Sequence, residues 1–257
     1  MPAMPTPAEV AGRLRAAGCV FAEDEAAIIM EAAATDAELA SLIDRRVAGE
    51  PLEVIVGWAE FAGLRIAVES GVFVPRRRTE LLAREAIAAA RPGCVVVDLC
   101  CGSGAIGAAV AASVPSSEVF AADVDPVAVR VARRNLPAER VFEGDLFAAL
   151  PSELRGRVAV LAVNAPYVPT DEIRLMPPEA REREPLITLD GGGDGLDVHR
   201  RIAAHALEWL APGGTLVIEV AERQVEAALE LFAVNGLRAR ILTDDELDAT
   251  VVVGIAP

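Results

Sequence analysis

Lysine is absent from this chain of 257 residues, so arginine supplies all 24 of its basic side chains. Aspartate and glutamate together number 39, which gives a formal net charge of −15 at pH 7. Broad binding to nucleic acid depends on cations that neutralise phosphates, and this charge balance opposes it. We therefore expect no nucleic-acid partner.

Sites that need several cysteines or histidines are also disfavoured. The chain contains four cysteines, none in a CxxC pair, and two histidines, His199 and His205, on one predicted helix. The adjacent Cys100 and Cys101 have a geometry that seldom forms a structural disulfide. We expect reduced thiols that pack as small apolar residues, and no metal site.

Long apolar runs are missing as well. No segment approaches the roughly 18 uncharged apolar residues of a membrane span, and residues 1–15 lack the apolar centre of a signal peptide. Aromatic residues make up only 4% of the chain, but hydrophobic residues reach 53%, which is enough for a core. These features predict a folded cytoplasmic enzyme with no membrane partner.

The most informative segment that is present follows an apolar run. Residues 158–163 predict a buried strand, and Asn164, Ala165, Pro166 and Tyr167 come directly after it. Ligands of open α/β sheets bind at such strand ends. The Asn164 amide and the Ala165 carbonyl offer two acceptors for the hydrogens of a planar NH2 group, and Tyr167 can stack on its plane. The alternative is a plain strand end with an Ala-Pro turn.

A glycine turn lies further upstream. Residues 95–97 predict a strand that ends at Asp98, and Gly102 and Gly104 precede an alanine-rich helix. The glycines let the backbone approach a ligand, and the helix offers free N–H groups. The glycine spacing also satisfies the dinucleotide fingerprint, which is weak evidence by itself. Asp98 favours instead a ligand that carries an amine or a cationic group near the turn.

An acidic strand end follows the glycine turn at the distance typical of nucleotide-binding folds. Residues 118–122 predict a second strand, which leads into Asp123 and Asp125. Acidic side chains at this place take the hydroxyl pair of a ribose.

Strand and helix patterns alternate from Cys94 onward, which predicts a doubly wound α/β sheet preceded by a helix from Thr79 to Ala90. Strands are expected at residues 94–99, 118–122, 140–143, 158–163, 215–220, 237–242 and 250–255, and helices at 104–113, 126–135, 198–210 and 222–235.

The N-terminal part has a different pattern. Helical periodicity covers residues 6–17, 22–34 and 36–48. Thr6 and Thr35 are placed as N-caps, and Gly18 and Gly49 as stops. We expect a small helical domain here, followed by a hairpin connector over residues 54–74.

One long segment lacks periodicity. Residues 166–195 are longer than the usual connection between two elements, and such long loops commonly have a function. We expect a loop over the active site, with a solvated insertion as the alternative. Glu184 could order this loop or form a surface salt bridge. The run Arg76, Arg77 and Arg78 predicts a solvated charge cluster, with an acidic partner as the alternative.

The order of these motifs resembles the class I S-adenosylmethionine-dependent methyltransferases and, within them, the protein-(glutamine-N5) methyltransferases that modify peptide chain release factors. The likeness runs from about residue 49 to the C-terminus. It rests on residues 49–57, 61–64, 71–76, 79–80, 144–147, 164–167, 184–185, 191–197 and 212–214. The chain departs from the family's Asn-Pro-Pro-Tyr at Ala165, from its first turn glycine at Cys100, and from its Pro-Arg-Pro-Glu-Thr-Glu loop at Arg77 and Arg78.

The resemblance implies a class I methyltransferase fold with a small N-terminal helical domain. It divides the chain into a helical substrate-recognition domain at residues 1–50, a β-hairpin connector at 51–78 and a methyltransferase domain at 79–257. Asn164, Ala165, Pro166 and Tyr167 would hold the acceptor. S-adenosylmethionine would be bound by Asp98, Cys100, Cys101, Gly102, Ser103, Gly104, Asp123, Asp145, Leu146 and Asn164.

These features together predict transfer of a methyl group from S-adenosylmethionine to the side-chain amide nitrogen of a glutamine in a protein such as a peptide chain release factor. Other acceptors stay open: a small molecule or peptide of secondary metabolism, or an exocyclic amine of a nucleic acid, which the charge opposes. A protein that binds the cofactor without turnover is a further alternative.

Overall fold

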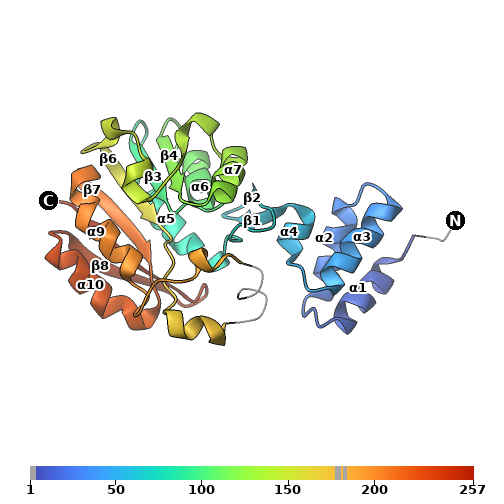
Figure 1. Ribbon diagram of the computed structural model, residues 1–257. Coiled ribbons are helices and arrows are strands. Elements are labelled where there is room, and N and C mark those ends of the chain that lie inside the picture. Colours follow the sequence, from blue (N-terminus) through green and yellow to red (C-terminus); the bar gives the residue numbers. More distant parts are fainter. Residues whose placement is uncertain (1–3, 177–180, 182–183) are drawn as a thin grey trace.

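A seven-stranded sheet forms the centre of the larger part of the chain (Figure 1). The computed structural model describes residues 4–176, 181 and 184–257. The strand order is β5-β4-β3-β6-β7-β9-β8, and β9 runs antiparallel to the other six strands. The strands are β3 Val95–Leu99, β4 Glu118–Asp123, β5 Val141–Glu143, β6 Val158–Val163, β7 Leu210–Glu219, β8 Arg238–Asp244 and β9 Ala249–Ile255.

Helices cover both faces of this sheet, and each face has its own apolar core. On β3, Val96 packs into the core shared with α5, α6 and α7, whereas Val97 and Leu99 pack into the core shared with α9 and α10. Successive strand residues point to opposite faces, so a strand buried on both sides reads as a continuous apolar run. The helices are α5 Glu80–Ala89, α6 Ala105–Ser113, α7 Pro126–Asn135, α9 Asp197–Trp209 and α10 Val225–Val234.

Three N-terminal helices form a separate bundle at one end of the molecule (Figure 1). They are α1 Pro7–Ala16, α2 Ala22–Ala32 and α3 Asp36–Val47. The predicted caps are confirmed, because the Thr6 and Thr35 hydroxyls accept hydrogen bonds from Glu9 N and Glu38 N. The helix stops are confirmed too, since Gly18 and Gly49 have φ of +97° and +83° after the last helical turns.

The connector between the two parts is only partly a hairpin. The antiparallel strands β1 Trp58–Phe61 and β2 Leu64–Ala67 match the prediction, but Leu52–Val56 forms the short helix α4. Its Ile55 is buried in the core of the helical bundle. Packing on the bundle therefore overrides the strand preference of this β-branched run.

Two further boundaries differ from the prediction. Strand β7 begins at Leu210 and shifts register against β6 before Thr215, and Gly213 between these two residues has a left-handed φ of +71°. Helix α10 begins at Val225, since Glu222–Gln224 form a 3₁₀ turn first. The other elements lie within two residues of their expected ends, and the predicted doubly wound α/β class is confirmed. None of the helices in the described ranges is long and apolar enough to cross a membrane.

Candidate active site

The strand order reverses between β3 and β6, and the candidate site lies at the carboxyl ends of these two strands. Leu99 pairs with Val163, so the residues that follow them come side by side. Ligands of doubly wound sheets bind at this reversal. A cavity of about 830 Å³ opens here, and its wall includes several of the predicted cofactor residues: Cys100, Cys101, Gly102, Ser103 and Asn164.

Asp98 is fully buried at 0% exposure behind the glycine turn. Its Oδ2 accepts a hydrogen bond from Gly107 N at 2.8 Å, but its Oδ1 has no hydrogen-bond partner in the described part of the chain. Burial raises the pKa of this carboxyl to about 8, although the Gly107 hydrogen bond acts in the opposite direction. A buried oxygen without a partner is costly, so its position suits a ligand that brings an ammonium group.

The glycine turn itself has left-handed backbone at three positions. Gly102 and Gly104 have φ of +53° and +77°, and Cys100 has φ of +58°. A side chain in this conformation costs about 1–2 kcal/mol, which explains why the family has glycine at the position of Cys100. Burial raises the pKa of the Cys100 thiol, so it stays protonated and is no nucleophile.

Asp123 connects the end of β4 to the glycine turn. Its Oδ2 accepts from Gly102 N at 2.8 Å, and its Oδ1 accepts from Asp125 N at 2.9 Å. Each carboxylate oxygen can accept a further hydrogen bond, so Asp123 keeps capacity for ribose hydroxyls. Asp125 caps α7 by accepting from Val127 N at 2.8 Å. Of the two acidic residues, Asp123 is thus the one placed beside the turn.

The other predicted cofactor residues do not line the cavity; they are Asp98, Gly104, Asp123, Asp145 and Leu146. Asp145 is exposed and pairs with Arg201 at 2.5 Å. Leu146 has φ of +49° at the start of a 3₁₀ turn. Gly104 closes the glycine turn by donating from its N to the Cys101 carbonyl at 2.7 Å.

Residues 164–167, which follow β6, are called the acceptor loop here, and one of their side chains is held in a fixed orientation. Asn164 Nδ2 donates to the buried hydroxyl of Thr79 at 3.2 Å. Asn164 Oδ1 and the Ala165 carbonyl oxygen make no hydrogen bond within the described residues. Because the amide nitrogen is committed to Thr79, the oxygen is left as a free acceptor in the cavity wall.

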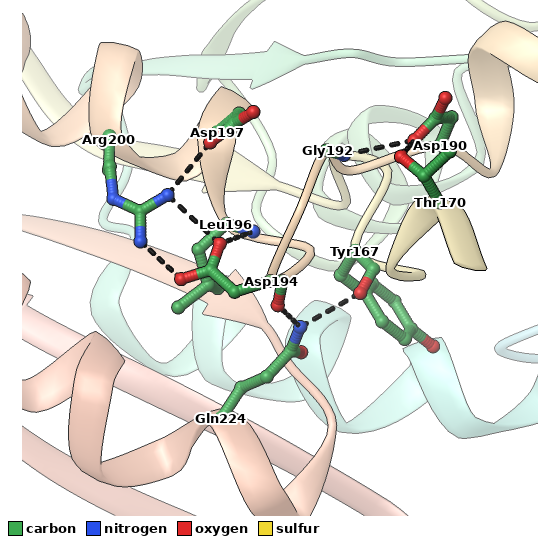
Figure 2. A network of polar contacts seen from close by, with 9 residues as sticks. All are labelled: Tyr167, Thr170, Asp190, Gly192, Asp194, Leu196, Asp197, Arg200 and Gln224. Carbon is green, nitrogen blue, oxygen red and sulfur yellow. Dashed lines mark hydrogen bonds and ion pairs between the residues drawn. The ribbon is translucent and has the colours of Figure 1, made fainter. Parts of the chain in front are cut away.

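Tyr167 is held at both of its ends. Its hydroxyl donates to Glu219 Oε1 at 3.0 Å. Figure 2 shows the other contact, in which Gln224 Nε2 donates to the Tyr167 carbonyl oxygen at 2.9 Å. The same Nε2 donates to the carbonyl of Asp194 at 2.9 Å. Burial and the Glu219 charge raise the pKa of the Tyr167 phenol, so the hydroxyl is a donor at neutral pH.

A second glycine-rich segment, the loop of residues 191–195, packs directly on Pro166 and Tyr167. Figure 2 shows Asp194, on this loop, joined to Arg200 of α9 by an ion pair, and Asp190 accepting from Gly192 N. A Cβ on Gly195 would lie 2.2 Å from the Tyr167 carbonyl oxygen, and one on Gly191 would lie 2.7 Å from that of Pro166. Only glycine fits at these two positions.

For Arg76 and Glu184 the structure favours one of the alternatives that the sequence left open, whereas Arg77 and Arg78 are exposed as expected. Arg76 is not part of a solvated run, because it pairs with Glu184 and its guanidinium lies 5.0 Å from the Phe73 ring centre. Glu184 does not form a surface salt bridge either, since its side chain is only 7% exposed. The predicted loop contributes Glu184 and Leu189 to the cavity wall, while its residues 177–180 and 182–183 lie outside the described residues.

Three residues of this site escaped the sequence analysis: Thr79, Glu219 and Gln224. Glu219 ends an apolar strand in the same way as Asp98 and Asp123, so the strand-end pattern could have identified it. Thr79 was assigned as a helix start and as part of the family resemblance, without a role in the site. Gln224 gave no local signal for its role, because the two carbonyls that accept from its Nε2 come from distant loops.

Comparisons with known proteins agree with this geometry. A model of the "Methyltransferase small domain" matches residues 63–174. A methyltransferase from Pyrococcus furiosus has a related fold, with a TM-score of 0.56, 18% identity and coverage of 75% of this chain and 89% of its own.

Two curated relatives are closer in sequence. A release factor glutamine methyltransferase of Geobacter sulfurreducens is 38% identical over 219 residues, which is 83% of this chain and 75% of that enzyme. A 4-amino-L-phenylalanine/4-methylamino-L-phenylalanine methyltransferase of Streptomyces pristinaespiralis is 38% identical over 203 residues, 76% of this chain and 69% of that enzyme. The glycine turn, the acidic strand ends and this similarity agree: the chain belongs to the release factor glutamine methyltransferase family and is an S-adenosylmethionine-dependent methyltransferase.

Proposed function

We propose that this chain methylates the side-chain amide nitrogen of a glutamine in a protein, and that this protein is a peptide chain release factor. The observation that carries the proposal is the pair of uncommitted acceptors, Asn164 Oδ1 and the Ala165 carbonyl oxygen, on neighbouring residues beside the cavity. Similarity to the Geobacter sulfurreducens enzyme supports the release factor as the acceptor.

The cofactor would be held by the residues around the glycine turn. Asp98 Oδ1 would accept from its ammonium group, and the backbone of residues 100–104 would lie against its amino-acid part. Asp123 would accept from the ribose hydroxyls, and Asp145 with Leu146 would contact the adenine. When bound, S-adenosylmethionine supplies a methyl group on a positively charged sulfonium. The unpartnered Asp98 oxygen and the positive φ angles of the turn fit such a ligand.

The acceptor amide needs help because its nitrogen is a poor nucleophile. The nitrogen lone pair is delocalised into the carbonyl group of the glutamine side chain. Asn164 Oδ1 and the Ala165 carbonyl would accept its two N–H bonds, which fixes the nitrogen and favours a more developed lone pair. The Tyr167 ring would stack on the amide plane. Orientation of this kind supplies roughly 7–11 kcal/mol in well-aligned systems.

No strong base is required in this scheme. The nitrogen gains one carbon and loses one proton, and that proton is acidic while the nitrogen carries positive charge. The acceptors on Asn164 and Ala165 already direct both N–H bonds away from the incoming methyl carbon. The proton then passes to water.

The N-terminal helical domain, residues 1–50, would recognise the acceptor protein. Asp24 of α2 and Arg46 of α3 belong to the cavity wall, so the bundle reaches the place where an acceptor would enter. Deletion of residues 1–48 should leave binding of S-adenosylhomocysteine intact and abolish methylation of a protein acceptor. Normal methylation by the truncated chain would show that the bundle is an appendage.

The decisive experiment offers labelled S-adenosylmethionine with four acceptors: a release factor, its variant with alanine in place of the methylated glutamine, 4-amino-L-phenylalanine and an adenine-containing oligonucleotide. Label in the release factor alone, absent from its glutamine-to-alanine variant, would support the proposal. Label in 4-amino-L-phenylalanine alone would favour the chemistry named for the Streptomyces pristinaespiralis relative. The variant Asn164→Ala should lose turnover on the true acceptor and keep its affinity for S-adenosylhomocysteine.

A further inference from the structure

Tyr167 receives its two anchors from one short segment of chain. Glu219 is the last residue of β7, and Gln224 belongs to the 3₁₀ turn Glu222–Gln224 that follows. The hydroxyl of Tyr167 donates to Glu219, and its carbonyl accepts from Gln224. The side chain and the backbone of Tyr167 are therefore both fixed by the connection between β7 and α10.

Both anchors are buried, which is unusual for these residue types unless they are bonded. Gln224 is 4% exposed and uses every polar atom of its side chain, because its Oε1 also accepts from Ala221 N at 3.0 Å. Glu219 is 2% exposed, and its Oε2 has no hydrogen-bond partner in the described part of the chain. Keeping a carboxylate in such a place costs stability, so a role beyond packing is needed to account for it.

Glu219 is also close to the residue that orients Asn164. The Thr79 hydroxyl, which accepts from Asn164 Nδ2, lies beside the Glu219 carboxylate and stabilises its charged form, which partly offsets the rise in its pKa from burial. One carboxylate thus adjoins both supports of the acceptor loop, the Tyr167 hydroxyl and the Thr79 hydroxyl.

We propose that Glu219 and Gln224 are positioning residues for methyl transfer, which hold the Tyr167 ring and the acceptor loop in the geometry that the acceptor nitrogen needs. This inference rests on the proposed function of Tyr167 in binding the acceptor amide. Neither residue lies among those that would touch the cofactor. Loss of either anchor should slow the chemical step without weakening cofactor binding, because an error of about 1 Å in placement can cost about a hundredfold in rate.

Four variants test the proposal on the full chain: Tyr167→Phe, Glu219→Met, Glu219→Gln and Gln224→Met. We expect Tyr167→Phe and Glu219→Met each to lower kcat on a release factor by at least roughly tenfold. Their double variant should be no slower than Glu219→Met alone, because Glu219→Met already removes the hydrogen bond that Tyr167→Phe removes. Glu219→Gln keeps an oxygen acceptor for the hydroxyl and should recover much of the rate lost in Glu219→Met.

Two measurements separate positioning from a general loss of structure. Affinity for S-adenosylhomocysteine, measured by calorimetry, and the unfolding temperature should change much less than kcat. Glu222→Met, an exposed carboxylate on the same turn, is the matched control and should leave kcat unchanged. The proposal is overturned if Glu219→Met and Gln224→Met keep the wild-type kcat, if the Tyr167→Phe and Glu219→Met effects simply add, or if cofactor affinity falls in step with kcat.

A spectroscopic arm works even if the acceptor is not a release factor. Tyr167 is the single tyrosine of the chain, so incorporated 3-fluorotyrosine gives one fluorine resonance. That resonance should shift or broaden in Glu219→Met and Gln224→Met and stay in place in Glu222→Met. An unchanged resonance in both anchor variants would refute the inference. If the wild-type protein does not methylate the release factor but the fluorine resonance shifts in the two anchor variants, only the proposed acceptor is refuted.

Discussion

Arg76 and Glu184 form an ion pair between two loops that are 108 residues apart in sequence and meet at the wall of the active-site cavity. The carboxylate is almost fully buried, whereas the guanidinium is partly exposed. Since Arg76 follows the hairpin and Glu184 follows the acceptor loop, the pair fixes the distance between two sides of the cavity.

Removal of the Arg76 side chain should therefore weaken binding of the acceptor more than binding of the cofactor. Arg76→Ala leaves a buried carboxylate without its partner, which costs about 2 kcal/mol or more for pairs of this kind. We expect the free energy of unfolding to fall by about that amount and KM for the protein acceptor to rise about tenfold or more. Denaturant titration and steady-state kinetics measure the two effects. Arg77→Ala, at an exposed neighbour, should do neither, and equal effects of the two variants would contradict the role of the pair.

Substitutions of Asp123 and Asp125 should have different effects, the first on cofactor binding and the second on the stability of α7. Asp123→Ala removes a charged hydrogen-bonding partner from the proposed ribose site and should weaken binding of S-adenosylhomocysteine by about 1.5–3 kcal/mol. Asp125→Ala removes the cap of α7 and should cost about 1 kcal/mol of stability with little change in affinity. Calorimetry and thermal unfolding of both variants test this division. A reversed pattern would place the ribose on Asp125.

Asp98 should give the free protein a stability that falls with rising pH. Its pKa in the folded chain is about 8, above the ordinary value of 3.8, because burial disfavours the charged form. The folded state then holds a proton that the unfolded state has lost, so this contribution is complete below about pH 4 and disappears as pH rises toward 8. Denaturant titrations of wild type and Asp98→Asn at several pH values isolate the effect. The expected result is a smaller decline in the variant between pH 4 and 8.

The sequence predicts those parts of the site that depend on local pattern. Asp98, Asp123 and Asn164 each follow an apolar strand, and parallel strands bring their carboxyl ends to one edge of the sheet. The capping threonines and stop glycines are equally local, because each acts on backbone groups within one helical turn. These expectations agree with the structure for that reason.

What the sequence did not predict depends on contacts between distant segments. The Tyr167–Glu219 hydrogen bond joins residues 52 apart, and nothing near either residue encodes the other. Helix α4 forms where β-branched residues favour a strand, because the bundle core takes up its apolar side chain. Arg76 looked like part of a solvated run for the same reason, since its partner lies on another loop.

The last prediction concerns Ala165, where the family has proline. The Ala165 N–H donates no hydrogen bond within the described residues, so a proline ring would remove no interaction there. A proline at this position would restrict Asn164 to extended backbone and reduce the freedom that the acceptor loop loses on binding. Ala165 is only 1% exposed, so the ring must fit against its neighbours.

If the acceptor is the glutamine of a release factor, Ala165→Pro should keep or raise kcat, with a gain of at most severalfold, since such restriction is worth about 0.4–1 kcal/mol. Kinetics on the release factor, with S-adenosylhomocysteine affinity as the check on folding, measure this. A large drop in kcat at unchanged cofactor affinity would mean that Asn164 and Ala165 of this chain bind a different acceptor.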